Sequence, residues 1–177
     1  MSSSTHTDGA AASVGQKSLI MKIIATFERI PHSFIALLGR FSIAAVFWLS
    51  GQTKITGLAI NFVSGEFVLG WPRLSDSAIA LFQDEYRLPL ISPVLAAHLS
   101  AFAEHFFPIL ILFGLATRFS ALALLCMTMV IEVLVYPDAY PTHGTWATIL
   151  LYLMARGPGA ISLDHLIQKR LGSPSTR

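Results

Sequence analysis

The sequence predicts an all-α membrane protein, a four-helix transmembrane bundle with short amphipathic surface helices. The first observation is composition: 54% of the 177 residues are hydrophobic and 12% are charged, whereas a soluble domain has roughly 25% charged residues. The second is segment length, because four apolar segments have lengths near the roughly 20 residues that a helix needs to cross a bilayer. The third is the net charge of only +2 without a basic stripe, which argues against nucleic acid as a partner.

The N-terminal region precedes the first apolar segment. Residues 1–16 are rich in Ser, Thr, Ala and Gly and lack the apolar core of a signal peptide, so we expect a disordered tail. Residues 17–33 alternate basic and apolar side chains. This alternation predicts an amphipathic surface helix that leads into the first span.

The first predicted span covers residues 34–60, with an uncharged centre between Arg40 and Lys54. These two residues are fourteen positions apart, close to four helical turns, so they project on nearly the same face. Each side chain could extend to its own membrane interface. Otherwise both face the interior of the bundle.

The extracytoplasmic connection that follows, residues 61–91, is too long and too apolar for a simple loop. Trp71-Pro72 indicates a break, and residues 76–86 have the pattern of a short surface helix. Long structured connections of this kind often act as lids.

Three more apolar segments complete the predicted bundle. The span over residues 92–115 has a proline suited to its first turn and Pro108 in its interior, where a kink is expected. The other spans cover residues 117–136 and 142–156, the latter short for a bilayer of about 30 Å. Residues 157–177 are expected to form an amphipathic cytoplasmic tail.

The distribution of basic residues predicts the orientation. Lys and Arg are frequent in the N-terminal segment, in the turn at Arg118 and in the tail, whereas the 61–91 connection is mainly acidic. By the positive-inside rule, the N- and C-termini are therefore both cytoplasmic.

Ionisable residues within the spans predict a polar intramembrane site. Each costs roughly 2.5–3.5 kcal/mol on insertion scales, so such groups usually face the interior of a bundle. Four of them lie at similar depth in the outer half and are expected to form one cluster beneath the 61–91 connection: Lys54, His98, Glu132 and His143. The other candidates are Arg40, Glu104 and His105, the last two near mid-membrane.

Several chemistries remain open for this site. The residues could form an ion-pair network that only fixes helix register. A metal site from His98, His105, Glu132 and His143 has suitable ligand types but lacks metal-ligand spacing on one helix. A proton path or a quinone pocket is the third reading, with the apolar lining drawn from Phe47, Trp48, Phe102, Phe106 and Phe107. The single cysteine, Cys126, excludes an intramolecular disulfide and any CxxC motif.

Arg40 with Gly51 and Lys54, the stretch from Glu104 to Arg118, and residues 156–164 are three motifs in order along the chain. Together they resemble the DoxX family, small four-helix bacterial membrane proteins. Arg40, Gly51 and Lys54 resemble the family's arginine followed by Gly-x-x-Lys. The stretch AEHFFPILILFGLATRFSAL is similar to its glutamate, apolar run and Gly-Leu-x-Thr-Arg sequence, here Glu104, Gly114, Thr117 and Arg118. RGPGAISLD, residues 156–164, is similar to the family's C-terminal motif, and the resemblance extends over residues 34–166.

The resemblance implies a multi-pass protein of the bacterial inner membrane. It further implies an accessory or small subunit of a quinone-linked redox system, because the family name derives from a subunit of a thiosulfate–quinone oxidoreductase. The chain has no haem, flavin or iron–sulfur motif, so it needs a partner for multi-electron chemistry. Quinone is the candidate cofactor; the expected partners are the lipid bilayer and a protein subunit. The alternatives are a small ion, metal or solute transporter or channel, and a membrane anchor or assembly factor for a partner enzyme.

Overall fold

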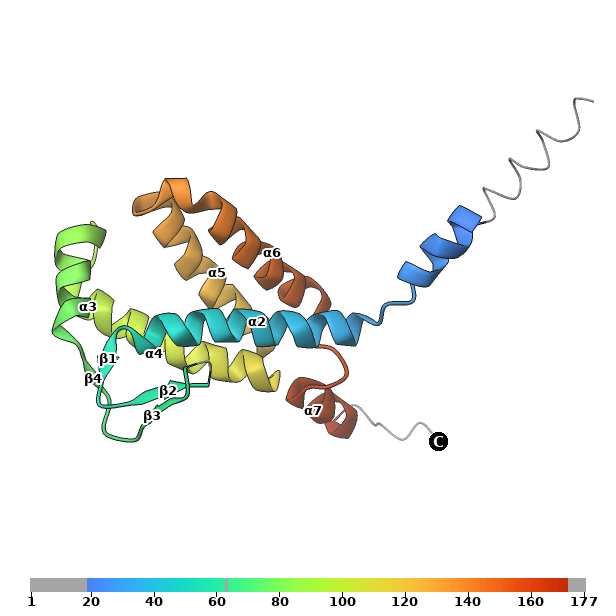
Figure 1. Ribbon diagram of the computed structural model, residues 1–177, viewed down its shortest axis with the longest axis horizontal. Helices are drawn as coiled ribbons and strands as arrows, with labels where there is room; N and C mark the ends of the chain where they lie inside the picture. Colours follow the sequence, from blue (N-terminus) through green and yellow to red (C-terminus); the bar gives the residue numbers. More distant parts are fainter. Residues whose placement is uncertain (1–18, 63, 172–177) are drawn as a thin grey trace, which may run out of the picture.

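The computed structural model describes residues 19–62 and 64–171. The tail expected at residues 1–16 lies outside these ranges. Residues 19–27 are helical, within the predicted surface helix, and their apolar side chains are exposed. This helix projects from the end of the bundle (Figure 1).

Four helices make up the bundle: α2 (His32–Gln52), α4 (Pro93–Phe113), α5 (Thr117–Leu134) and α6 (Tyr140–Arg156). Helix α2 lies along α4, and α5 lies along α6 (Figure 1). Buried apolar side chains from all four helices form the core, among them Ile43, Ile111, Leu124 and Leu150.

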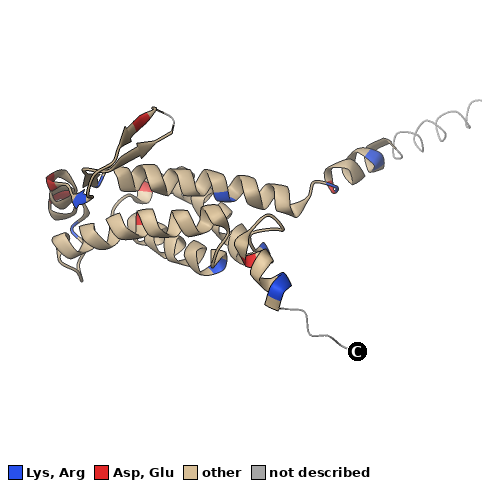
Figure 2. Cartoon of the chain, turned by 90° about the horizontal axis from the view of Figure 1, so that it is seen from below, with Lys and Arg blue, Asp and Glu red and all other residues tan. Residues whose placement is uncertain are grey.

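The outer surface of the bundle is apolar. Large side chains such as Phe41, Phe102 and Phe119 are exposed on α2, α4 and α5, and charged residues gather towards the two ends (Figure 2). Helices α2, α4 and α5 are long and apolar enough to cross a membrane. The chain is therefore an all-α membrane protein. Helix α6 has only 17 residues and is not among these three helices, so a fourth membrane crossing stays a prediction.

Helix α2 ends earlier than the predicted first span, at Gln52 instead of residue 60. The chain then forms β1 (Ile55–Thr56) and β2 (Ala59–Asn61), which pair antiparallel with β4 (Arg73–Leu74) and β3 (Glu66–Val68), respectively. Gly57 is the physical reason for the turn: its φ is +86°, and a Cβ there would lie 2.5 Å from the Trp71 carbonyl oxygen. Only glycine adopts this conformation at little cost.

A short helix follows the strands where the sequence predicts one. Helix α3 (Asp76–Ala80) begins at Ser75, whose hydroxyl accepts from the Ala78 amide, and continues as the wider π-helix η1 (Leu81–Tyr86). Phe82 of η1 packs against Ala96 and Ala97 near the start of α4. This contact holds the connection over one end of the bundle.

The remaining connections are short. Helix α4 continues through Pro108 and ends at Gly114, whose φ is +67°. A turn at η2 (Pro137–Ala139) joins α5 to α6, and the surface helix α7 (Leu163–Leu171) lies in the predicted tail.

Candidate functional site

A buried ion pair lies between α2 and α4. Lys54 follows the last turn of α2, and its Nζ is 2.7 Å from Oε2 of Glu104 in the middle of α4. The two residues are only 4% and 2% exposed. Since an unpaired charge is very costly in such surroundings, the two residues neutralise each other.

Two serines complete the hydrogen bonding of this pair. Lys54 Nζ also donates to the hydroxyl and the carbonyl oxygen of Ser50, at 3.2 and 3.3 Å. The Ser100 hydroxyl donates to Oε1 of Glu104 at 3.0 Å. Ser50 and Ser100 each lie four residues before their partner, one helical turn away and on the same face. The pair is thereby fixed in position.

Gly51 allows the two helices to approach closely at this point. A Cβ on Gly51 would lie 2.7 Å from Cε1 of His105 and 3.1 Å from the Glu104 Cβ. Any larger residue must therefore displace the imidazole ring or separate α2 from α4. The glycine of the Gly-x-x-Lys motif is explained by this contact.

The His105 ring has a defined tautomer. Gln52 Oε1 accepts from the Ile60 amide at 2.7 Å, which leaves Gln52 Nε2 to donate to His105 Nε2 at 2.8 Å. His105 then carries its proton on Nδ1 and donates it to the Ala101 carbonyl at 2.7 Å. The network assigns a neutral imidazole. It also joins β2 to α2 and α4.

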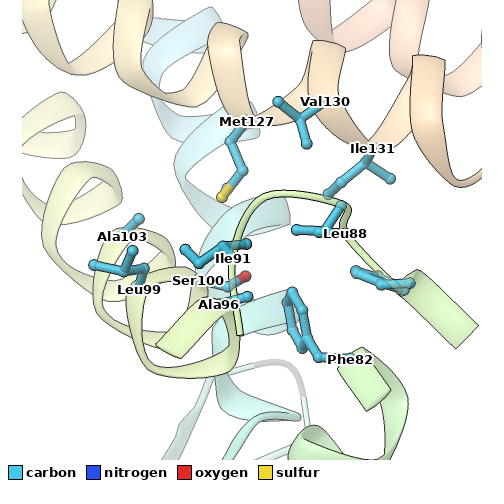
Figure 3. Close-up of a pocket in the computed structure, with 11 residues that line it drawn as sticks. Phe82, Leu88, Ile91, Ala96, Leu99, Ser100, Ala103, Met127, Val130 and Ile131 are labelled. Carbon is cyan, nitrogen blue, oxygen red and sulfur yellow. The ribbon is translucent and has the colours of Figure 1, made fainter. Parts of the chain in front are cut away.

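An apolar pocket of about 200 Å³ lies beside the ion pair, between α4, α5 and the segment that contains η1. Ser100 is one of the lining residues, although its hydroxyl donates to Glu104. Met127 faces Phe82 across the space (Figure 3). Leu99 on α4 and Val130 on α5 also line it, and they are 52% and 41% exposed on the lipid-facing surface. The pocket is therefore open at the outer surface of the bundle.

Tyr86 also lines this pocket, whose surface is almost wholly apolar. Burial raises the pKa of its phenol above the ordinary value, and the negative charge of Glu104 raises it further. The phenol is thus a hydrogen-bond donor at neutral pH. Its ring meets that of Tyr136 edge to face, and the Tyr136 hydroxyl donates to Glu85.

The residues predicted to share one outer cluster lie in separate places. Glu132 and His143 form their own pair between α5 and α6, with Oε2 and Nδ1 2.6 Å apart. Lys54 pairs with Glu104 instead. His98 is exposed, and its Nδ1 bonds the Val94 carbonyl of its own helix. Comparable depth along the predicted spans therefore did not determine the partners of these groups.

Arg40 lies at the other end of the bundle. It is 1% exposed, and its guanidinium donates to the carbonyls of Leu112 and Ile161. The nearby Asp164 carboxylate accepts the amides of Ala116 and Thr117, at 2.8 and 2.9 Å, and so caps α5. Arg40, the turn at residues 114–118 and the C-terminal motif at residues 156–164 therefore form one structural unit. This unit joins the α4–α5 turn to the C-terminal segment.

The structure also places the residues of the predicted metal site, the single cysteine and the predicted aromatic lining. Within residues 19–62 and 64–171, no three His, Cys, Asp or Glu side chains are grouped to hold a metal ion. Cys126 is exposed on α5. Of the aromatic residues predicted as lining, Trp48 contacts the His105 ring, whereas Phe102 and Phe106 stack on each other at the exposed surface.

Sequence reasoning missed several residues of the site: Gln52, Ser100, Tyr86, Phe82 and Met127. The signal for Ser100 was present, because it precedes Glu104 by one helical turn. No comparable signal existed for the pocket residues, which come from three separate segments.

Comparison with known proteins agrees with the motifs. An uncharacterized protein of Haemophilus influenzae is 34% identical over 100 residues, an alignment that covers 51% of this chain and 66% of that protein. The chain thus spans somewhat less than two thirds of the length of that relative. No solved structure matches. The family model DoxX matches residues 35–137, which is more than half of the chain, and the chain therefore belongs to the DoxX family.

Proposed function

We propose that this DoxX protein is a small membrane subunit of a quinone-linked redox system, and that the pocket beside Lys54 and Glu104 binds the quinone headgroup. The observation that carries the proposal is an apolar pocket, open towards the bilayer, beside a buried and hydrogen-bonded ion pair. Ligand sites typically combine an apolar lining with a few polar groups that fix orientation.

The apolar lining of the pocket suits a quinone ring. Among the lining residues, Tyr86 carries a protonated phenol, which is the candidate donor to a quinone carbonyl, and Ser100 connects the pocket to the Glu104 carboxylate. The pocket, about 200 Å³, is matched to a ring and not to a whole isoprenoid quinone. The tail would leave between Leu99 and Val130 and lie along the apolar exterior. Electrons would pass to or from a partner subunit that carries the redox group.

Filling the pocket tests the proposal. Ala103 lines the pocket on α4, so Ala103→Phe should occupy the space where the ring binds. Ala45→Phe is the matched control, because Ala45 is exposed on α2 and does not line the pocket. Full-length protein would be purified from native membranes, and its bound quinone quantified by chromatography.

The amount of bound quinone decides whether the proposal holds. Quinone retained by wild type and by Ala45→Phe, but lost from Ala103→Phe, supports the proposal. A protein that purifies without quinone and does not bind added short-chain quinone contradicts it.

A transport function is a second candidate, favoured by the Glu132–His143 pair. This pair of titratable groups lies between α5 and α6, apart from Lys54 and Glu104. Chains of carboxylate and histidine residues in bundles often conduct protons. Proteoliposomes loaded with a pH-sensitive dye would show proton flux in wild type and its loss in Glu132→Gln if transport is the function.

A further inference from the structure

We propose that a cleft at the Arg40 end of the bundle binds the phosphate group of an anionic phospholipid. This proposal is independent of the quinone site. The cleft has a volume of about 550 Å³ and lies between the start of α2, the start of α5, the end of α6 and α7. Its lining includes Arg118 at the beginning of α5 and Arg156 in the last turn of α6.

The two arginines make the cleft attractive to an anion. Both are exposed, and neither forms a salt bridge within the part of the chain that the structure describes. The planar guanidinium group suits the geometry of a phosphate. Asp164 also lines the cleft, but both of its oxygens already accept backbone amides at the start of α5. The two positive charges of the arginines exceed the single negative charge of Asp164.

Two polar atoms in the cleft-lining residues lack hydrogen-bond partners. Thr117 lines the cleft and is fully buried, yet its Oγ1 has none. His32 bonds the Tyr152 hydroxyl through Nδ1 at 2.7 Å, but its buried Nε2 has no partner. Unsatisfied buried polar atoms are rare in folded proteins and call for an explanation. Both atoms belong to residues that line the cleft.

The wall of the cleft is preformed by the Gly157-Pro158-Gly159 turn. The Ala160 amide donates to the Ser33 hydroxyl at 2.9 Å, and a Cβ on Gly159 would lie 2.8 Å from the Ser33 Cα. This close contact fixes the turn against the start of α2. A site with a preformed backbone binds its ligand with less ordering cost.

The position of the cleft favours a lipid over free phosphate. Phe119 lines it and is 64% exposed, which offers apolar surface to an acyl chain beside the two arginines. Helix α7 next to it exposes Leu166 and Ile167 and ends in the basic residues Lys169 and Arg170. An amphipathic helix of this composition lies in the interface of a bilayer, at the depth of the phosphates.

Native mass spectrometry of the full chain, with phosphatidylglycerol or phosphatidylcholine added to the detergent, tests the assignment. Wild type should retain a phosphatidylglycerol adduct, and Arg118→Gln with Arg156→Gln should weaken it roughly fivefold for each arginine removed. The control variant, Lys169→Gln with Arg170→Gln, removes the same charge outside the cleft. It should retain the adduct.

The outcomes are distinguishable. Equal loss in both double variants, or equal retention of both lipids, overturns the proposal, because binding would then depend on overall charge or on none. Inorganic phosphate that displaces the lipid at similar concentration overturns the lipid assignment in favour of a free phosphate. If the double variant does not fold, Arg156→Gln alone provides the test at an exposed position.

Discussion

Lys54 and Glu104 meet at 2.7 Å between α2 and α4, and the Ser50 and Ser100 side chains satisfy their remaining hydrogen bonds. This contact joins the motif of Arg40, Gly51 and Lys54 to the motif that begins at Glu104 in α4. It also places a balanced pair of charges beside an apolar pocket. Its contribution to stability and to function can be separated by substitution.

Replacing one partner of this pair should be more harmful than replacing both. Glu104→Leu leaves a buried Lys54 ammonium without a counter-charge, which costs about 3–5 kcal/mol. Glu104→Gln keeps an acceptor for Lys54 and should fold better than Glu104→Leu but lose quinone binding. Lys54→Met with Glu104→Leu should recover most of the stability. Unfolding by SDS in mixed micelles, followed by circular dichroism, measures all four proteins.

The contrary result is equally clear. If Glu104→Leu retains full stability and full quinone binding, the pair has neither a structural nor a functional role.

Gly51→Ala should destabilise the bundle, and Gly39→Ala should not. The new methyl group at position 51 would lie 2.7 Å from the His105 ring, whereas at position 39 it would meet only Ile149, at an ordinary 3.4 Å. Overpacking costs typically about 1–3 kcal/mol, while alanine in a helix is otherwise better than glycine by about 1 kcal/mol. The same SDS titration compares the two variants. Rescue of Gly51→Ala by His105→Ala would identify the clash as the cause.

The four helices of the bundle and the DoxX motifs could be predicted from the sequence because apolar segment length and motif order are local properties. The partner of Lys54 could not be predicted, since depth along a helix does not give the rotation of one helix against another. The early end of α2 was missed because Ile55, Ile60 and their neighbours are as apolar as a span. Hydropathy does not distinguish a strand that packs over the bundle from a helix inside it.

Asp164→Ala should loosen the α4–α5 turn. The carboxylate caps the start of α5 through the amides of Ala116 and Thr117, and loss of such a cap costs about 0.5–2 kcal/mol. Asp138→Ala is the control, because Asp138 is exposed in η2. Hydrogen exchange should increase at the first amides of α5 in the first variant only. Unchanged exchange there would exclude the capping role.

Stability at alkaline pH should depend on Tyr86. Its pKa is raised in the folded protein by burial and by Glu104, whereas an unfolded tyrosine has a pKa of about 10. Below that pH the phenol is protonated in both states, so its contribution is constant; above it the unfolded chain releases a proton that the folded chain retains. Stability therefore falls as pH rises beyond about 10. Tyr86→Phe should lessen this fall, and Tyr140→Phe, at a 70% exposed residue, should not.

The fourth crossing by α6 can be tested with single cysteines. In a Cys126→Ser background, Asp76→Cys, Asp138→Cys and Lys169→Cys place a thiol in the connection, in η2 and in α7. Four spans with cytoplasmic termini predict that a membrane-impermeant maleimide labels positions 76 and 138 in intact spheroplasts, and position 169 only after lysis. If α6 does not cross, positions 138 and 169 lie on the same side. Labelling of position 169 in intact spheroplasts would therefore contradict the four-span topology, and labelling of position 138 only after lysis would contradict the orientation.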